Sequence, residues 1–401
     1  MYLPLAILAS FAFLYSIAAA RIEKTPFTGP IVFISFGILV GPLGVGWLDL
    51  EVTTTELRVL ADLTLAMLLF SEAANVDRSA LEHGIRIPTR MLLIGLPGVI
   101  GLGYLIGVVM FGGELTMLEI AILATTLAAT DAALGKAVVT NKAVPARLRE
   151  ALNVESGLND GLCVPILLLF LALATAGNGE ANIVEMATGL FAKELGIGLA
   201  VGLGVTAVGS WLYRNALKLG WLTTDSVQMP ITMLSLSCFA VAQSLHGSGF
   251  IAAFVGGFLF GYIARRRSHD LVLHTEGAGD LLGMMTWAVF GAVVIPAVID
   301  DFIWPVVVYA LLSLTVIRVL PIVLSLSGTK EPIESKLFLA WFGPRGLASI
   351  VFAVIVLNNN LPGAELIAVI VACTIILSAF AHGLTAKPFA AAVAARLPPL
   401  K

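Results

Sequence analysis

The sequence is short of charged residues. Only 12% of its 401 residues are charged, and the formal net charge is −3. A typical soluble domain carries roughly 25% charged residues, so a soluble globule of this length would lack the charge to cover its surface. The small net charge also excludes the strongly basic face on which nucleic-acid binding depends. The composition therefore argues against a soluble enzyme, a disordered chain and a nucleic-acid-binding protein.

Cysteine is scarce as well. Cys163, Cys238 and Cys373 each lie within an apolar run, and their spacing matches neither a disulfide framework nor a zinc site. We interpret all three as small apolar side chains and expect no cofactor.

Apolar residues are abundant, at 59% of the chain. A membrane-spanning helix needs about 20 mostly apolar residues, and division at charged, glycine and proline clusters predicts thirteen such helices. The predicted fold is therefore an all-α polytopic membrane protein, a single transmembrane domain over 1–401 without a soluble regulatory domain. The predicted helices span 2–20, 27–46, 57–75, 89–111, 117–140, 149–175, 186–214, 228–246, 249–264, 279–299, 302–327, 336–357 and 364–386.

The basic residues give an orientation. Eighteen of the 23 Lys and Arg residues lie after odd-numbered predicted helices or in the C-terminal tail. Because Lys and Arg collect on the cytoplasmic side, we expect the N-terminus outside, the C-terminus in the cytoplasm, and a multi-pass protein of the cell (inner) membrane. Merging 228–246 with 249–264 would destroy this bias, so the two are kept separate.

Three predicted helices carry ionisable groups near their centres, which costs at least ~2.5–3.5 kcal/mol for each group. Asp131 lies in 117–140, Glu155 and Asp160 lie in 149–175, and Arg345 lies in 336–357. Asp131, Asp160 and Arg345 are about 10–14 residues from a helix end, or roughly 15–20 Å, and Glu155 precedes Asp160 by five residues. We therefore expect all of them at the same depth, near the middle of the membrane.

The 149–175 helix presents a polar stripe. Glu155 and Asn159 are four residues apart, as are Ser156 and Asp160, so each pair shares a helix face. Carboxylate, hydroxyl and carbonyl oxygens suit a small hard cation, and three acids near one arginine leave net negative charge.

Other charged residues are interpreted as structural or peripheral to the cation site. For Glu155 with Arg345, an ion pair that pins helices together is the better interpretation. Arg318 is expected to reach the membrane surface or to cap a helix end, and Glu72 to line an entrance funnel.

Interrupted helices point independently to the same region. Gly343-Pro344 precedes Arg345 in 336–357, and Thr130-Asp131 stands at the centre of 117–140. Paired interruptions indicate a binding site near the membrane midplane. The two helices are the fifth and the twelfth, so they run in opposite directions, as an inverted repeat requires.

At these residues the chain resembles the NhaP-type sodium/proton antiporters of the monovalent cation:proton antiporter superfamily. The resemblance covers essentially the whole chain and is sharpest at ATDAALG, NVESGLNDG and GPRGLAS. It implies a homodimer in the lipid bilayer, with crossed fifth and twelfth helices. It also implies a mobile core over approximately 89–175 and 302–386, and a scaffold for dimerisation over approximately 1–88 and 186–299.

The resemblance further implies residue roles. Glu155 would pair with Arg345, and Asn159 would hold the crossed segment. Because Asn159 stands where the electrogenic branch has a second aspartate, exchange would be electroneutral, one cation for one proton. The family often has a proline after the fifth-helix aspartate, where this chain has Ala132, so that break must depend on Thr130 and its partners. The implied ligands of Na⁺, or of Li⁺ or K⁺, and of the proton are Asp160, Asp131, the Ser156 hydroxyl and the backbone at Thr130.

Two alternatives remain at this stage. A sodium-coupled symporter for an organic solute would want polar or aromatic groups around a larger cavity. An intramembrane aspartyl protease would use Asp131 and Asp160 as a dyad, but the glycine-flanked motif of such enzymes is absent. Neither the preferred cation nor a pH sensor follows from the sequence. The five histidines are expected to be solvated loop or helix-end residues, namely His83, His246, His269, His274 and His382.

Overall fold

The computed structural model describes residues 2–22, 25, 27–48, 54–76, 86–131, 134, 138, 141, 144–175, 183–223, 227–264 and 267–396. Every regular element among them is helical, and no β-strand occurs in these ranges. The predicted all-α fold class is therefore confirmed.

The helices follow the predicted apolar segments in order. They are α1 (Tyr2–Ile22), α2 (Gly29–Val40), α3 (Thr54–Ala74), α5 (Arg86–Arg90), the π-helical turn η1 (Met91–Gly95), α6 (Leu96–Phe111), α7 (Met117–Thr126), α9 (Ala146–Thr175), α10 (Ile183–Lys218), α11 (Met229–Ser244), α12 (Gly249–Ala264), α13 (Ser268–Val289), the π-helical turn η3 (Phe290–Val294), α14 (Ile295–Val298), the 3₁₀ turn η4 (Ile299–Asp301), α15 (Trp304–Leu314), α16 (Val316–Ser325), α17 (Ile333–Trp341), α18 (Leu347–Asn358) and α19 (Ala364–Arg396).

The chain forms two compact units. Unit 1 comprises 1–58, 79–159 and 284–401, and unit 2 comprises 59–78 and 160–283. The division into a mobile core and a scaffold stays a prediction.

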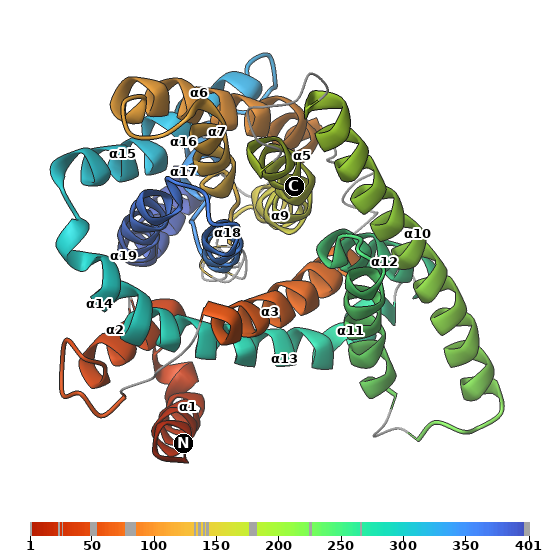
Figure 1. Ribbon diagram of the computed structural model, residues 1–401. Helices are drawn as coiled ribbons and strands as arrows, with labels where there is room; N and C mark the ends of the chain where they lie inside the picture. The colour runs from red at the N-terminus through yellow and green to blue at the C-terminus, as the bar shows by residue number, and fades with distance from the viewer. Residues whose placement is uncertain are drawn as a thin grey trace. The chain divides into compact units, whose positions relative to one another are not determined.

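Within unit 1, α18 packs against both α7 and α19, and α19 also packs against α15 (Figure 1). α16 contacts α6 and α17. These helices surround the two interruptions that the sequence predicted.

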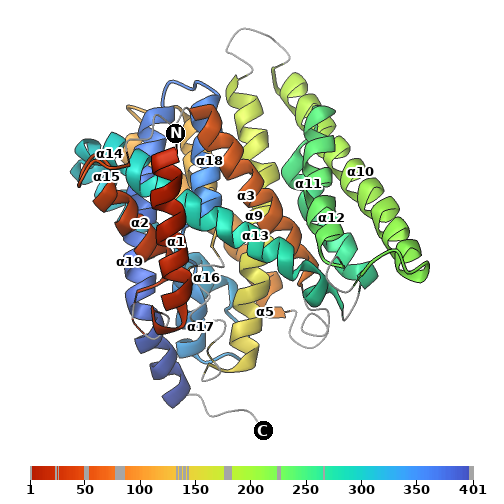
Figure 2. The ribbon, with the colours of Figure 1, turned by 90° about the horizontal axis from the view of Figure 1, so that it is seen from below.

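Within unit 2, α10, α11 and α12 pack side by side (Figure 2). Gly198 and Gly202 of α10 allow the close approach, because a Cβ on either would meet the backbone of Ser248 or Ala252. Small residues at helix contacts are typical of membrane proteins, where packing rather than water exclusion drives association.

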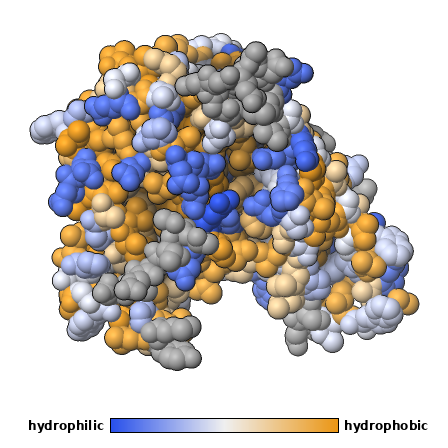
Figure 3. Space-filling view, viewed as in Figure 1, coloured by the Kyte–Doolittle hydropathy of each residue, from blue (hydrophilic) through white to orange (hydrophobic). Residues whose placement is uncertain are grey.

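Seven described helical spans are long and apolar enough to cross a membrane, and five further apolar helices are shorter. Large apolar side chains are exposed along many of them, including Val109 and Phe13, and Figure 3 shows broad apolar areas on the visible surface. α3 belongs to neither set, so the number of thirteen crossings stays a prediction, as does the orientation. Among the basic residues on which the orientation depends, Lys24, Arg78, Lys142, Arg265, Arg266 and Lys401 lie outside the described residues.

The observed helix ends agree with the sequence prediction at one position and differ from it at another. The predicted separation of 228–246 from 249–264 is confirmed, because α11 ends at Ser244, α12 begins at Gly249, and His246 adopts φ 57° between them. At the C-terminus, α19 continues to Arg396 instead of ending near 386, and it passes through Pro388. The alanine-rich residues after Pro388 are strong helix formers and offset the missing amide.

Candidate functional site

The first interruption follows α7. Thr116 and Glu119 form a capping box at the start of this helix, and the helix ends at Thr126. A broken helix leaves carbonyl oxygens without amide partners, and the membrane interior offers no water to replace them. Side chains from other elements supply the donors. Ser349 Oγ donates to the Thr126 oxygen (2.9 Å), Asn159 Nδ2 to Ala128 (3.3 Å), Arg345 Nη1 to Ala129 (3.5 Å) and Ser156 Oγ to Thr130 (3.4 Å).

The second interruption covers 342–346, between α17 and α18. Pro344 has no amide hydrogen to donate, and Gly346 adopts φ −156° and ψ −133°, outside the helical region. The Arg345 side chain folds back so that Nη1 donates to the Gly343 oxygen at 3.1 Å. The predicted Gly-Pro break therefore lies where the sequence placed it.

Asp131 joins the two interruptions. Its backbone N–H donates to the Pro344 oxygen (2.8 Å), and its Oδ2 accepts from the Leu347 N–H (2.7 Å) at the start of α18. Its Oδ1 accepts from the Leu134 N–H at 3.1 Å. The carboxylate therefore caps α18, where the positive end of the helix dipole also favours negative charge.

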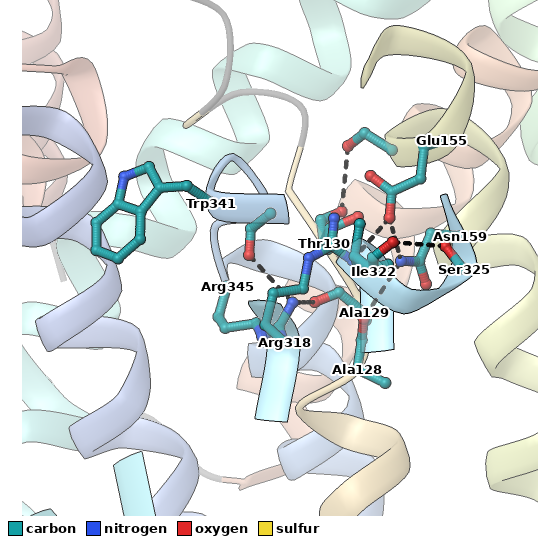
Figure 4. A network of polar contacts seen from close by, with 12 residues as sticks. Ala128, Ala129, Thr130, Glu155, Asn159, Arg318, Ile322, Ser325, Trp341 and Arg345 are labelled. Atoms are coloured by element: carbon teal, nitrogen blue, oxygen red, sulfur yellow. Dashed lines mark hydrogen bonds and ion pairs between the residues drawn. The ribbon is translucent and has the colours of Figure 1, made fainter. Parts of the chain in front are cut away.

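Glu155 is a second junction. It is 1% exposed, and its Oε1 accepts from Arg318 Nη1 at 2.8 Å and from Asn159 Nδ2 at 3.1 Å. These three side chains point toward one another in Figure 4. The Arg318 guanidinium also lies against Gly343, where an added Cβ would overlap it. Through these contacts Glu155 connects α9 and α16 to both interruptions.

This arrangement corrects two expectations. The ion pair that the structure describes for Glu155 is with Arg318, where the family pattern implied Arg345, and Arg318 is buried rather than at the membrane surface. A further irregularity at Thr315 (φ −109°, ψ −92°) separates α15 from α16 shortly before Arg318. Arg345, in turn, donates to the carbonyls of Ala129 and Gly343.

The remaining predicted ligands lie on or beside α9. Ser156 and Asp160 are 8% and 6% exposed, and α9 is continuous through both, so they share a face of the helix. Thr130 is buried at the first interruption. Glu72 is partly buried on α3. Ala132 lies outside the described residues.

The expectation for the histidines is wrong at one position. His382 is 1% exposed, within α19, because its ring is enclosed at the second interruption. His246, His269 and His274 are exposed, as expected, and His83 lies outside the described residues.

Sequence reasoning missed four contributors to the site. Arg318 carried a usable signal, since a charged residue well inside an apolar helix needs a partner. Ser349 and Ser378, whose Oγ accepts from the Arg345 N–H, carried none, because single hydroxyls are common in membrane helices and nothing in a linear pattern shows which group they face. His382 was judged only by its position near the end of a predicted helix.

The whole site can be compared with known proteins. A family described as "Sodium/hydrogen exchanger, transmembrane" matches residues 8–392. The K(+)/H(+) antiporter NhaP2 of Shewanella sp. (strain ANA-3) is 24% identical over 370 residues, which are 92% of this chain and 63% of that protein. The Na(+)/H(+) antiporter of Saccharomyces cerevisiae is 22% identical over 369 residues, 88% of this chain and 37% of that protein. The chain thus spans less than two thirds of the length of these relatives.

Solved structures share the fold. The sodium proton antiporter MjNhaP1 from Methanocaldococcus jannaschii at pH 8 matches with a TM-score of 0.74 and 20% identity, covering 95% of this chain and 99% of that one. An electron-microscopy structure of the same antiporter matches with a TM-score of 0.78 and 19% identity over the whole of both chains. Since the family match covers nearly every described helix, including both interruptions, this chain belongs to the transmembrane sodium/hydrogen exchanger family.

Proposed function

We propose that this protein is a secondary active antiporter that exchanges one monovalent cation for one proton by alternating access. The cation is Na⁺, or Li⁺ or K⁺ at the same site. Asp160 is the shared carrier, and Asp131, the Ser156 hydroxyl and the Thr130 backbone supply further oxygens. The proposal includes a homodimer in the cell membrane with a cytoplasmic C-terminus.

One observation carries the proposal, namely the balance of buried charge around the interruptions. Among the described residues of α9, α16 and the interruptions, three acids and two arginines are buried, and the formal charges of these five sum to −1 when all are ionised. Arg318 therefore reduces the surplus that the sequence predicted. A surplus of buried carboxylates in an apolar interior favours the binding of one proton or one monovalent cation. The acids are Asp131, Glu155 and Asp160, and the arginines are Arg318 and Arg345.

This balance supports competition between the two ions. Burial disfavours the ionised carboxylate, whereas a bound cation favours it. A site that must carry one positive charge holds a proton or a cation, and its movement between the two membrane faces exchanges them. The expected stoichiometry is therefore one to one, without net charge transfer.

Asp160 is assigned as the carrier because of its burial and its place on the polar face of α9. Glu155 is engaged by Arg318, and Asp131 caps α18. Asp160 stands one helical turn after Ser156 on α9, where a carboxylate and a hydroxyl present oxygens on one face. Capping does not exhaust Asp131, because an ionised carboxylate has about four acceptor sites.

The names of the relatives include both K⁺ and Na⁺ as exchanged ions, which is why the proposal leaves the preferred cation to experiment. In proteoliposomes with an imposed pH gradient, addition of Na⁺, Li⁺ or K⁺ should collapse the gradient, measured with a pH-sensitive fluorophore. Titration of each cation at several pH values should show proton competition as a higher apparent KM at lower pH. Protein-free liposomes are the control. A gradient that none of the three cations dissipates would rule out the proposal.

Electroneutrality needs its own measurement. With the counterions held constant, an imposed membrane potential of either sign should leave the exchange rate unchanged, because no net charge moves. A rate that follows the potential would contradict one-to-one exchange while leaving antiport itself intact.

A further inference from the structure

The second interruption contains a gap that two side chains of α19 fill. In an unbroken α-helix the N–H of Arg345 would donate to the carbonyl of Trp341, four residues earlier. Here the Arg345 N–H donates to Ser378 Oγ at 2.7 Å, and the Trp341 oxygen lies 2.9 Å from His382 Nε2. Ser378 Oγ and His382 Nδ1 are themselves 3.2 Å apart. The two groups that the break separates are thus reconnected through one serine and one histidine.

The direction of each hydrogen bond follows from what each group can donate. A carbonyl oxygen only accepts, so His382 Nε2 must carry a hydrogen toward Trp341. In a neutral imidazole Nδ1 is then an acceptor, and the Ser378 hydroxyl donates to it while accepting from the Arg345 N–H. Nδ1 also lies 3.0 Å from the Ser378 carbonyl oxygen. Because Nε2 already carries a hydrogen, Nδ1 could donate to this oxygen only in the doubly protonated imidazolium. With a neutral ring, each group in the series of hydrogen bonds from the Arg345 N–H through Ser378 and His382 to the Trp341 oxygen has a partner.

We propose that Ser378 and His382 form a hydrogen-bond relay that replaces the missing helix bond and fixes the shape of the second interruption. Both are positioning residues for cation exchange, because the segment they hold presents Pro344 and Leu347 to Asp131. The inference deepens the proposed function, on which its transport readout rests.

Burial gives the relay its energetic weight. Ser378 and His382 are both buried, and the His382 ring packs against the indole of Trp341 with centroids 5.1 Å apart. A buried donor or acceptor that loses its partner costs roughly 1–3 kcal/mol. Removal of Ser378 takes the acceptor from the Arg345 N–H, so that the segment must shift to satisfy it. Removal of His382 takes one of two donors from the Trp341 oxygen, which still accepts from the Gly343 N–H at 2.8 Å.

α19 also supplies a matched control. Thr374 is buried on the same helix, and its hydroxyl donates to the Ile370 oxygen of that helix. Thr374→Val removes a buried hydroxyl of the same element without touching the interruption. A purely structural requirement for hydroxyls in α19 would affect this variant as much as Ser378→Ala.

The test compares the apparent KM for Na⁺, or for whichever cation exchanges fastest, in proteoliposomes. We expect Ser378→Ala to raise KM by roughly 5- to 100-fold, the equivalent of one unsatisfied buried group. His382→Phe should raise KM by a smaller factor, because the Trp341 oxygen keeps the Gly343 N–H as a donor. Ser378→Thr, which keeps the hydroxyl, and Thr374→Val should stay close to wild type. The double variant should be no worse than the more affected single variant, because both break one relay. If His382→Phe does not fold, His382→Leu takes its place, because this smaller apolar side chain also lacks both the donor and the acceptor.

The outcomes separate the two proposals. Unchanged KM in both relay variants of an active protein, or equal losses in Thr374→Val, would overturn the relay. A wild-type protein without exchange would instead remove the proposed function. In that case the relay is tested without transport, by the nitrogen NMR spectrum of ¹⁵N-histidine-labelled protein. The His382 signals are assigned by their loss in His382→Gln. A neutral ring with hydrogen on Nε2 supports it, and an imidazolium or the other tautomer contradicts it.

Discussion

The two interruptions meet at Asp131, but they are stabilised in different ways. The segment after α7 has its carbonyls bound by donors from three separate elements, α9, α18 and the second interruption. The segment between α17 and α18 is held by Asp131 on one side and by the single continuous helix α19 on the other. The hydrogen bonds at the first break therefore come from three separate elements, whereas those named for the second break come from Asp131 and α19.

This difference indicates a division of labour. The first interruption places the Thr130 carbonyl beside Ser156 of α9, which is one of the proposed ligands. The second contributes a buried positive charge at Arg345 and is attached to the continuous helix α19. The first segment thus presents a proposed ligand, whereas the second is attached to a neighbouring helix.

The largest expected effect comes from Glu155, which serves both interruptions. Glu155→Gln leaves Arg318 buried without its counter-charge, and breaking a buried ion pair in this way costs roughly 3–5 kcal/mol. The double variant Glu155→Gln with Arg318→Met removes both charges and should be more stable than Glu155→Gln alone. Thermal unfolding in detergent measures both. Destabilisations that simply add would show that the two residues do not act as a pair.

The next effect isolates the contact between the interruptions. Asp131→Ala leaves the amides of Leu134 and Leu347 without their carboxylate, at roughly 1–3 kcal/mol each. Asp131→Asn keeps one oxygen and should be intermediate. Hydrogen exchange at Leu347 reports the loss directly, because its amide is the first of α18. An unchanged exchange rate at Leu347 in Asp131→Ala would disprove the capping role.

These contacts also show how far the sequence predicts the site. The breaks at Thr130-Asp131 and Gly343-Pro344 were predictable, because a charge inside an apolar helix and a helix-breaking dipeptide are local signals. The partner of Glu155 was not, because helical spacing gives depth along one helix but not the rotation of its neighbour after the irregularity at Thr315. The burial of His382 was missed for a related reason. Its position near the end of a predicted helix suggested solvent, but α19 continues past it.

A smaller effect tests the close approach of the two segments. A Cβ on Gly346 would overlap the Asp131 carboxylate, so Gly346→Ala should destabilise by about 1–3 kcal/mol, as overpacking in a core does. Gly101→Ala is the control, since nothing lies within 4 Å of a Cβ there. If the two alanine variants unfold at the same temperature, the segments are not in the tight contact described.

The smallest effect concerns one carbonyl of the first interruption. Ser349→Ala removes the donor to the Thr126 oxygen, for an expected loss of about 1 kcal/mol. Ser237→Ala provides the comparison, because Ser237 is exposed and bonds only its own helix. Since several donors share the first interruption, Ser349→Ala should lower transport less than Ser378→Ala. A larger loss of transport in Ser349→Ala than in Ser378→Ala would contradict the proposed difference between the two segments.

The most direct measurement of the central claim is exchange by Asp160→Asn in proteoliposomes. Asparagine keeps the size of the side chain but can neither release a proton nor supply a negative charge to a cation. The account predicts a folded protein in which Na⁺, Li⁺ and K⁺ no longer move protons, while Asp270→Asn, at an exposed position of α13, exchanges like wild type. Cation-driven proton movement that persists in Asp160→Asn would contradict the claim that this carboxylate carries both ions.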